Sequence, residues 1–162
     1  TPVLWRGPII AGTVKQFYSD IIWGDINYMF IDCPPGTGDV PLTIFQSIPI
    51  DGVVVVTTPQ DLVSVIVGKA VHMADSMNIP VIGMIENMSY FICPDCNNKH
   101  YIFGKSQLEQ VIRDLYIGHA IRLPINPSLA GLMDRGEIEH MEANADLQEF
   151  ADLISTFDPD KY

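Results

Sequence analysis

Four short segments dominated by apolar residues divide the chain. They cover residues 28–32, 53–57, 81–85 and 119–123. Each is followed within a few residues by proline, asparagine or glycine, which end regular strands. Strands that are apolar on both faces are typical of parallel sheets covered by helices. The pattern therefore predicts that these four segments form the strands of a parallel sheet.

Between and after these segments, apolar residues recur at helical spacing. Alternation of strands and helices with short connections is the signature of right-handed βαβ units. We therefore expect an α/β fold, a mostly parallel sheet with helices on both faces, in a single domain over residues 1–162. The predicted helices cover 13–22, 40–48, 62–78 and 128–135, with one opened by a capping box at Ser106 and Glu109 and a terminal one capped by Asn144.

Polar residues follow three of the predicted strands where each strand ends. Asp32 closes the first strand, Thr57 and Thr58 the second, and Asn87 lies just beyond the third. In open α/β sheets, ligands bind outside the carboxyl ends of the strands. The positions of these side chains therefore predict one shared binding site at this edge of the sheet.

The composition of the chain argues against several classes of partner and of protein. The 162 residues include 48% hydrophobic and 18% charged residues and carry a formal net charge of −11. This charge would repel nucleic acid and anionic membrane surfaces, so we expect neither as a partner. No apolar run approaches the roughly 20 residues needed to span a bilayer. Three cysteines, two of them in a Cys-x-x-Cys pair, fit a reducing compartment, and we expect a cytoplasmic protein.

The stretch DCPPGTGD at residues 32–39 joins a predicted strand to a predicted helix. Its prolines and glycines prevent either element from continuing through it. An apolar strand that delivers a carboxylate, here Asp32, into a rigid glycine-containing turn is typical of the Walker B site of P-loop NTPases. There the aspartate holds Mg²⁺ beside the phosphates. A strand that ends in an ordinary polar turn is the alternative, which so constrained a turn disfavours.

This stretch resembles the switch II segment of the Mrp (ApbC-like) family of iron–sulfur carrier ATPases, within the MinD/ParA group of P-loop proteins. The resemblance extends from Trp5 to Gly136. The family's glycine-rich, lysine-containing phosphate loop has no counterpart here, so the chain resembles the carboxyl-terminal part of such a protein, with an incomplete P-loop fold. Four further motifs agree in order, WGD at 23–25, VTTPQD at 56–61, ENMSYF at 86–91 and CPDC at 93–96.

The resemblance implies roles for single residues. It implies that Asp32 is the catalytic residue that partners Mg²⁺. It also implies that the backbone N–H of Gly36 approaches the γ-phosphate of ATP and that Thr37 shapes the switch loop. It assigns adenine recognition to Asn87 and a place in the base pocket to Pro124. Without the resemblance, Asn87 is better interpreted as the cap of a turn. In related proteins the phosphate-loop strand lies between the strands at 28–32 and 53–57, so we expect a gap or abnormal pairing there.

Cys93 and Cys96 form the most chemically specific motif, because a two-residue gap lets both thiolates reach one metal centre. The spacing is compatible with a zinc knuckle completed by His100 and one further ligand, with a redox pair, and with half of a shared cluster site. The spacing alone favours zinc. The resemblance favours a four-iron cluster bridged by the cysteines of two chains in a homodimer. Cys33 is interpreted as a packing residue.

The leading hypothesis is an ATP-dependent iron–sulfur cluster carrier that uses ATP and Mg²⁺ and delivers its cluster to apo iron–sulfur proteins. We expect the intact protein to hydrolyse ATP and this chain alone to be inactive. One alternative is a dimerising ATPase switch of the MinD/ParA type, which has no metal centre. The other is a noncatalytic, zinc-bearing interaction module. Metal analysis separates the three, because it finds iron with sulfide, no metal or zinc.

We predict that the 162-residue chain alone does not bind ATP tightly. The sequence contains no glycine-rich loop that would supply consecutive N–H donors and a lysine to the phosphates. Isothermal titration calorimetry with MgATP should therefore detect no micromolar binding, whereas a longer protein that includes such a loop should bind. A micromolar dissociation constant for this chain would show that the phosphates are held elsewhere.

Overall fold

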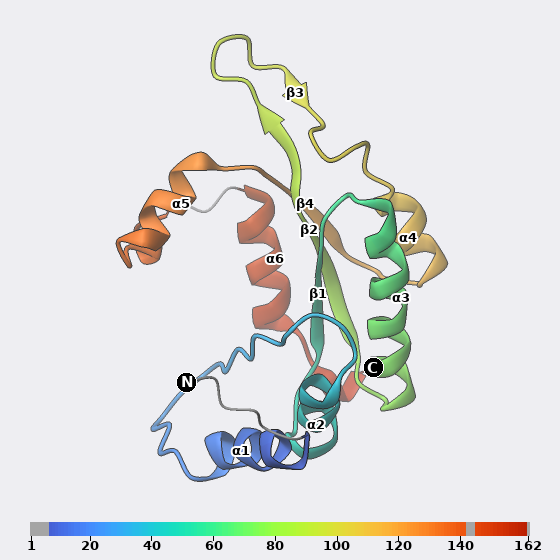
Figure 1. Ribbon diagram of the computed structural model, residues 1–162, viewed down its shortest axis with the longest axis vertical. Helices are drawn as coiled ribbons and strands as arrows, with labels where there is room; N and C mark the ends of the chain where they lie inside the picture. The colour runs from blue at the N-terminus through green and yellow to red at the C-terminus, as the bar shows by residue number, and fades with distance from the viewer. Residues whose placement is uncertain (1–6, 142–144, 162) are drawn as a thin grey trace.

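The computed structural model describes residues 7–141 and 145–161. Figure 1 shows a sheet with helices on both faces and a hairpin that projects from one end. The strands are β1 (Val53–Thr57), β2 (Val81–Ile92), β3 (Lys99–His100) and β4 (Ala120–Pro124). The helices are α1 (Gly7–Ser19), α2 (Asp39–Ser47), α3 (Asp61–Ser76), α4 (Leu108–Asp114), α5 (Pro127–Asp134) and α6 (Ala145–Thr156), with short 3₁₀ turns η1 (Ile138–His140) and η2 (Pro159–Lys161).

The strand β2 is the centre of the sheet. It pairs in parallel with β1 on one side, where Val55 lies opposite Met84, and with β4 on the other, where Ile85 lies opposite Ile121. The far end of β2 pairs with β3 in the antiparallel direction. The predicted α/β class and mostly parallel sheet are confirmed, with β3 as an antiparallel extension that the sequence pattern does not predict.

The main core lies between the sheet and the helices α3 and α4. Burial of a side chain the size of valine, leucine or methionine stabilises a fold by about 1.5–3 kcal/mol. The second face of the sheet is covered by α6, whose Phe150 is buried. Helices therefore cover both faces, as the sequence predicts (Figure 1). The buried residues of the main core are Val55, Val67, Val71, Met84, Leu108 and Ile117.

The predicted strand at 28–32 is wrong, because this segment has no regular secondary structure. Tyr28 and Phe30 are 57% and 77% exposed. A strand needs a neighbour that pairs with its backbone N–H and C=O groups. β1 is an edge strand, and within the described residues no strand pairs with its outer side. We expected a gap between the strands at 28–32 and 53–57, or their abnormal pairing. Neither arises, because only the strand at 53–57 forms.

The other elements follow the predictions with shifted ends. β2 continues seven residues beyond the predicted Ile85, to Ile92, and carries the chain out of the sheet. The helix predicted at 13–22 begins earlier, at Gly7. The terminal helix is confirmed as α6, whereas its predicted cap Asn144 lies outside the described residues. In the described ranges, no helix combines the length and apolarity that crossing a membrane requires.

We predict that Gly83→Ala destabilises the protein. A Cβ atom at this position would lie 2.8 Å from Phe150 Cε2 and 2.9 Å from the His119 carbonyl oxygen. Overpacking of this kind costs about 1–3 kcal/mol in free energy of unfolding. Urea denaturation followed by circular dichroism measures the loss.

The matched control for this prediction is Gly68→Ala. Gly68 lies inside α3, and nothing lies within 4 Å of an added Cβ atom. Alanine is favoured over glycine in a helix by about 1 kcal/mol, so this variant should be as stable as the unmodified chain or more so. Equal stability of the Gly83 and Gly68 variants would contradict the packing of α6 on β2.

Candidate metal and nucleotide sites

The Cys-x-x-Cys pair lies at the tip of the hairpin formed by β2 and β3 (Figure 1). The turn is closed by two backbone hydrogen bonds. The Cys93 N–H donates to the Asn98 carbonyl at 3.0 Å, and the Asn97 N–H donates to the Cys93 carbonyl at 2.9 Å. Asn97 has a φ of 56°, a left-handed conformation that asparagine adopts more readily than most residues. Local sequence therefore fixes the turn that presents the cysteines.

Three potential metal ligands meet at this tip. The sulfur atoms of Cys93 and Cys96 and an imidazole nitrogen of His100 all lie within 4.8 Å of one another. Cys93 is half-buried, while Cys96 and His100 are exposed. Thiolate and imidazole ligands suit zinc, iron and other transition metals rather than magnesium or calcium. The tip is therefore a candidate metal centre on chemical grounds.

The turn also favours the metal-binding form of Cys93. Hydrogen bonds from the backbone N–H of Cys96 and then of Asp95, followed by one from the Cys96 side chain, lower the pKa of the Cys93 thiol. A lower pKa increases the fraction of thiolate at neutral pH, and the thiolate is the form that binds metals. The two-residue spacing thus places hydrogen-bond donors as well as a second sulfur atom beside the Cys93 sulfur.

Cys33 differs from this pair in position and in chemistry. It is half-buried in the irregular segment before α2 and does not belong to the ligand group at the hairpin tip. Burial, and then the negative charge of Asp32, raise the pKa of the Cys33 thiol. Cys33 therefore remains protonated under conditions in which Cys93 is more readily ionised.

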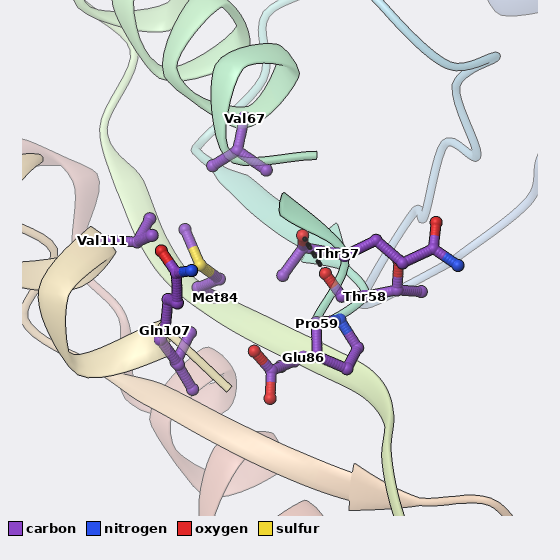
Figure 2. Close-up of a pocket in the computed structure, with 10 residues that line it drawn as sticks. Thr57, Thr58, Pro59, Val67, Met84, Glu86, Gln107 and Val111 are labelled. Atoms are coloured by element: carbon purple, nitrogen blue, oxygen red, sulfur yellow. Dashed lines mark hydrogen bonds between the residues drawn. The ribbon is translucent and has the colours of Figure 1, made fainter. Parts of the chain in front are cut away.

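A shallow cavity opens at the carboxyl end of β1, between α3 and α4 (Figure 2). Thr57, the last residue of β1, lies opposite Glu86 in the middle of β2. This is the edge at which the sequence predicts a ligand site. The cavity is lined by Thr57, Thr58, Pro59, Gln60, Val67, Met84, Glu86, Gln107, Leu108 and Val111.

Asn87 and Pro124 lie close to this edge but outside the cavity lining. They occupy neighbouring strands, β2 and β4, where the strand pairing shifts between Glu86 and Tyr90. Asn87 Oδ1 accepts a hydrogen bond from the Met88 N–H at 2.9 Å, and Met88 has a φ of 54°. In this structure Asn87 lies within β2 and stabilises the irregularity in that strand, so it does not cap a turn as the residue alone suggests.

Asp32, Gly36 and Thr37 lie elsewhere, in the irregular and exposed segment before α2. None of them lines the cavity between α3 and α4. Gly36 is exposed and has a φ of 89°, a left-handed conformation that favours glycine. The structure brings Thr57, Thr58 and Glu86 of β2 together, but it does not bring Asp32 to the same cavity.

A buried carboxylate that sequence reasoning missed forms the floor of the cavity. Glu86 is 2% exposed, and its oxygens accept hydrogen bonds from Ser89 Oγ at 2.5 Å and Ser106 Oγ at 2.9 Å. Arg122 Nε lies 3.6 Å from Glu86 Oε1 and donates to Ser106 Oγ at 3.1 Å. These partners offset the cost of removing the Glu86 charge from water.

The network continues to α4. The Arg122 guanidinium donates to Glu109 at 2.5 Å, and this hydrogen bond is the main cause that lowers the pKa of the Glu109 carboxyl. Ser106 Oγ accepts from the Leu108 N–H at 3.1 Å, but the N-cap of α4 is Gln107, so the predicted capping box does not form. Glu109 pairs with Arg122. The sequence signal for the network was an acidic residue placed directly after the apolar segment 81–85.

Comparison with known proteins identifies relatives over most of the chain. Residues 1–157 match a protein family described as ParA, NUBPL iron-transfer P-loop NTPase. The iron–sulfur cluster carrier protein of Methanocaldococcus jannaschii is 47% identical over 137 residues, which are 84% of this chain and 47% of that protein. The iron–sulfur cluster carrier protein of Aquifex aeolicus is 44% identical over 137 residues, 85% of this chain and 38% of that protein.

A solved structure is similar as well. It is a nucleotide-binding protein from Archaeoglobus fulgidus in complex with ADP, in which cobalt was found by PIXE. The match has a TM-score of 0.78 and 40% sequence identity and covers 88% of this chain and 58% of that one. The chain spans about half the length of the curated relatives that it matches. The similarity confirms a fold of the P-loop NTPase type for the matched region.

We predict that Cys93 reacts with alkylating agents at lower pH than Cys33. The thiolate is the reactive form, and the pKa is lowered for Cys93 and raised for Cys33 from an ordinary value of 9.0. Iodoacetamide labelling of the metal-free chain, resolved by peptide mass spectrometry, should give a pH–rate midpoint below 9.0 for Cys93 and above it for Cys33. The reverse order would contradict the hydrogen bonds assigned to the turn.

Proposed function

The chain belongs to the ParA family, in the group described as NUBPL iron-transfer P-loop NTPases, and from this membership we propose that it is part of an ATP-dependent iron–sulfur cluster carrier. The curated relatives named iron–sulfur cluster carrier protein support the proposal. The observation that carries it is the pair Cys93 and Cys96 at the tip of a projecting hairpin, with their sulfur atoms within 4.8 Å of each other.

In this proposal the hairpin tip holds half of the cargo site. A four-iron cluster takes four thiolate ligands, and each chain offers Cys93 and Cys96 at one place. A twofold axis beside the tip completes the set from a second copy, and twofold dimers are the commonest assembly. Cys33 does not substitute, because it lies outside the ligand group and burial disfavours its thiolate. Exposure of Cys96 and His100 leaves the cluster accessible to a recipient protein.

ATP and Mg²⁺ are assigned to the carboxyl edge of the sheet and to the segment before α2. Asp32 supplies a carboxylate oxygen of the kind that Mg²⁺ prefers, and its exposure leaves it free to accept the ion. Gly36 offers a backbone N–H to the γ-phosphate, and Thr37 shapes that loop. Binding of ADP by the similar protein from Archaeoglobus fulgidus supports a nucleotide here. Mg²⁺, when bound, neutralises charge that develops on the phosphates.

Asn87 and Pro124 are proposed to receive the adenine base. Their positions on the paired strands, Asn87 within β2 and Pro124 at the end of β4, support this assignment. Because Asn87 Oδ1 already accepts from the Met88 N–H, its side-chain NH₂ is the group that it would offer to a purine nitrogen. Hydrolysis itself requires the phosphate loop, so we propose that it occurs in a protein that includes one and not in these 162 residues alone.

The recipients of the cargo are proposed to be apo iron–sulfur proteins in the cytoplasm. The net charge of −11 disfavours nucleic acid and anionic membranes as partners. The reduced cysteines that the hairpin requires favour a reducing compartment. The chain would therefore meet its recipients in solution through the hairpin.

We predict that anaerobic reconstitution with iron and sulfide yields a brown dimer with about two irons per chain, because two chains share one four-iron cluster. Visible absorption, iron and sulfide analysis and size-exclusion chromatography measure the product. Cys93→Ser and Cys96→Ser should each abolish the colour and the cluster-linked dimer. Cys33→Ser is the matched control and should retain both.

Two results would overturn the proposal. One is a cluster that forms unchanged in the Cys93→Ser or Cys96→Ser variant. The other is loss of the cluster in the Cys33→Ser variant while the chain remains folded by circular dichroism.

A further inference from the structure

The hairpin that carries the cysteines also carries apolar side chains that neither its turns nor its cysteines require. We propose that six residues beside the tip, the hairpin flank, form the docking surface for an acidic protein partner, the apo recipient of the cargo. The inference rests on the proposed carrier function for the identity of that partner, and it concerns the flank and not the thiols. The flank comprises Ile92, Lys99, Tyr101, Ile102, Phe103 and Lys105.

Strand pairing places the first members of the flank on one face of the hairpin. Ile92 lies directly opposite Lys99 in the ladder between β2 and β3, so their side chains share a face. Lys99 Nζ lies 4.2 Å from the centroid of the Tyr90 ring, and Tyr90 belongs to the same face because it is two residues before Ile92. Phe91 and His100 form the adjacent pair and occupy the opposite face, and His100 is grouped with the thiols. The flank is therefore separate from the face that faces the cargo site.

A tight turn after β3 presents the remaining apolar members of the flank. The Gly104 N–H donates to the Tyr101 carbonyl at 3.3 Å, and Ile102 and Phe103 occupy the two central positions of this turn. Central turn positions normally hold glycine, proline, asparagine, aspartate or serine. Here they hold two large apolar side chains that are 60% and 37% exposed. Exposed apolar side chains that gather on one element mark an interaction surface, because internal packing does not account for them.

The hairpin differs in charge from the rest of the chain. Two lysines and one aspartate give residues 88–105 a net charge of +1, which leaves −12 for the remainder. Lys99 and Lys105 are both exposed. β2 extends to Ile92, six residues beyond Glu86, the partner of the last β1 residue, and this distance is up to about 20 Å. It exceeds the screening length of about 8 Å at physiological ionic strength, so the lysines act largely independently of the acidic remainder.

These charges favour an acidic partner over a second copy of the chain as the occupant of the flank. Two copies that meet about a twofold axis bring equal flanks, and hence their lysines, towards each other. An acidic surface with an apolar centre instead complements both the lysines and the apolar side chains. A contact built from so few residues buries less than about 1,200 Å², which is typical of transient encounters. Transient binding suits a partner that leaves once it has received the cargo.

The apo form of an acidic four-iron ferredoxin serves as the probe. Titration of the ¹⁵N-labelled, metal-free chain with this protein should shift the backbone amide signals of residues 92 and 99–105 in fast exchange, and added salt should weaken binding. The double variant Lys99→Glu/Lys105→Glu should bind at least about 10-fold more weakly, because two attractive charges become repulsive. The matched control is Lys15→Glu/Lys69→Glu, which makes the same change in net charge at exposed lysines of α1 and α3 and should bind with unchanged affinity.

Ile102→Ser tests the apolar part of the flank. Because Ile102 is exposed, this variant should remain folded by circular dichroism and bind about 5–10-fold more weakly. Ile22→Ser, at a side chain that is 96% exposed outside the hairpin, is its control and should bind normally. The inference is overturned if the lysine variant or the Ile102 variant binds with unchanged affinity, or if the shifted signals lie outside the hairpin. It is also overturned if dilution of the chain alone moves the same signals, because a second copy would then occupy the flank.

The use of metal-free chain separates this inference from the proposed function. Reconstitution of the flank variants with iron and sulfide should form the shared cluster at the level of the unmodified chain, since the flank supplies no thiolate. A chain that binds apo-ferredoxin through the flank but assembles no cluster would sustain the docking surface and refute the carrier proposal. A chain that assembles the cluster but does not bind apo-ferredoxin would refute the docking surface alone.

Discussion

The position of the cysteine pair depends on one strand, β2, whose two halves serve different purposes. Its first half is paired on both sides, with β1 and β4, and is buried through Met84 and Glu86. Its second half runs beyond β1, keeps one pairing with β4 at Tyr90 and Pro124, and ends in the ladder with β3. Because one continuous backbone links the halves, the ladder that forms the sheet also fixes the direction of the hairpin. The cysteines are thus presented by the hydrogen-bonded turn that joins β2 and β3.

The buried Glu86 carboxylate secures the point at which β2 leaves the sheet. It is bound by Ser89 from β2 itself and by Ser106 before α4, and Arg122 of β4 lies beside it. Removal of one member of such a buried network typically costs about 3–5 kcal/mol, because the remaining charge stays unpaired. Three elements are therefore fixed relative to one another beside Asn87, which is the residue proposed to contact adenine. A nucleotide bound at this edge and a metal bound at the hairpin tip would therefore lie at two points along the same strand, β2.

The sequence was sufficient for the elements whose partners are also in the chain. The apolar segments at 53–57 and 81–85 pair with each other, so their pattern and their structure agree. The segment 28–32 has the same pattern but no strand beside it among the described residues, and pattern alone does not report on partners. Cys93 and Cys96 were found because their spacing is local. The contacts of Glu86 with Ser106 and Arg122 depend on strand register and helix packing, which no single motif specifies.

The central claim is that one chain provides only half of the cargo site. Native mass spectrometry of the anaerobically reconstituted chain tests it most directly, because the mass reports chains and cluster together. The account predicts a species of two chains with one four-iron cluster and no single chain that carries a cluster. A cluster retained by a single chain, or a dimer with one cluster on each chain, would contradict it.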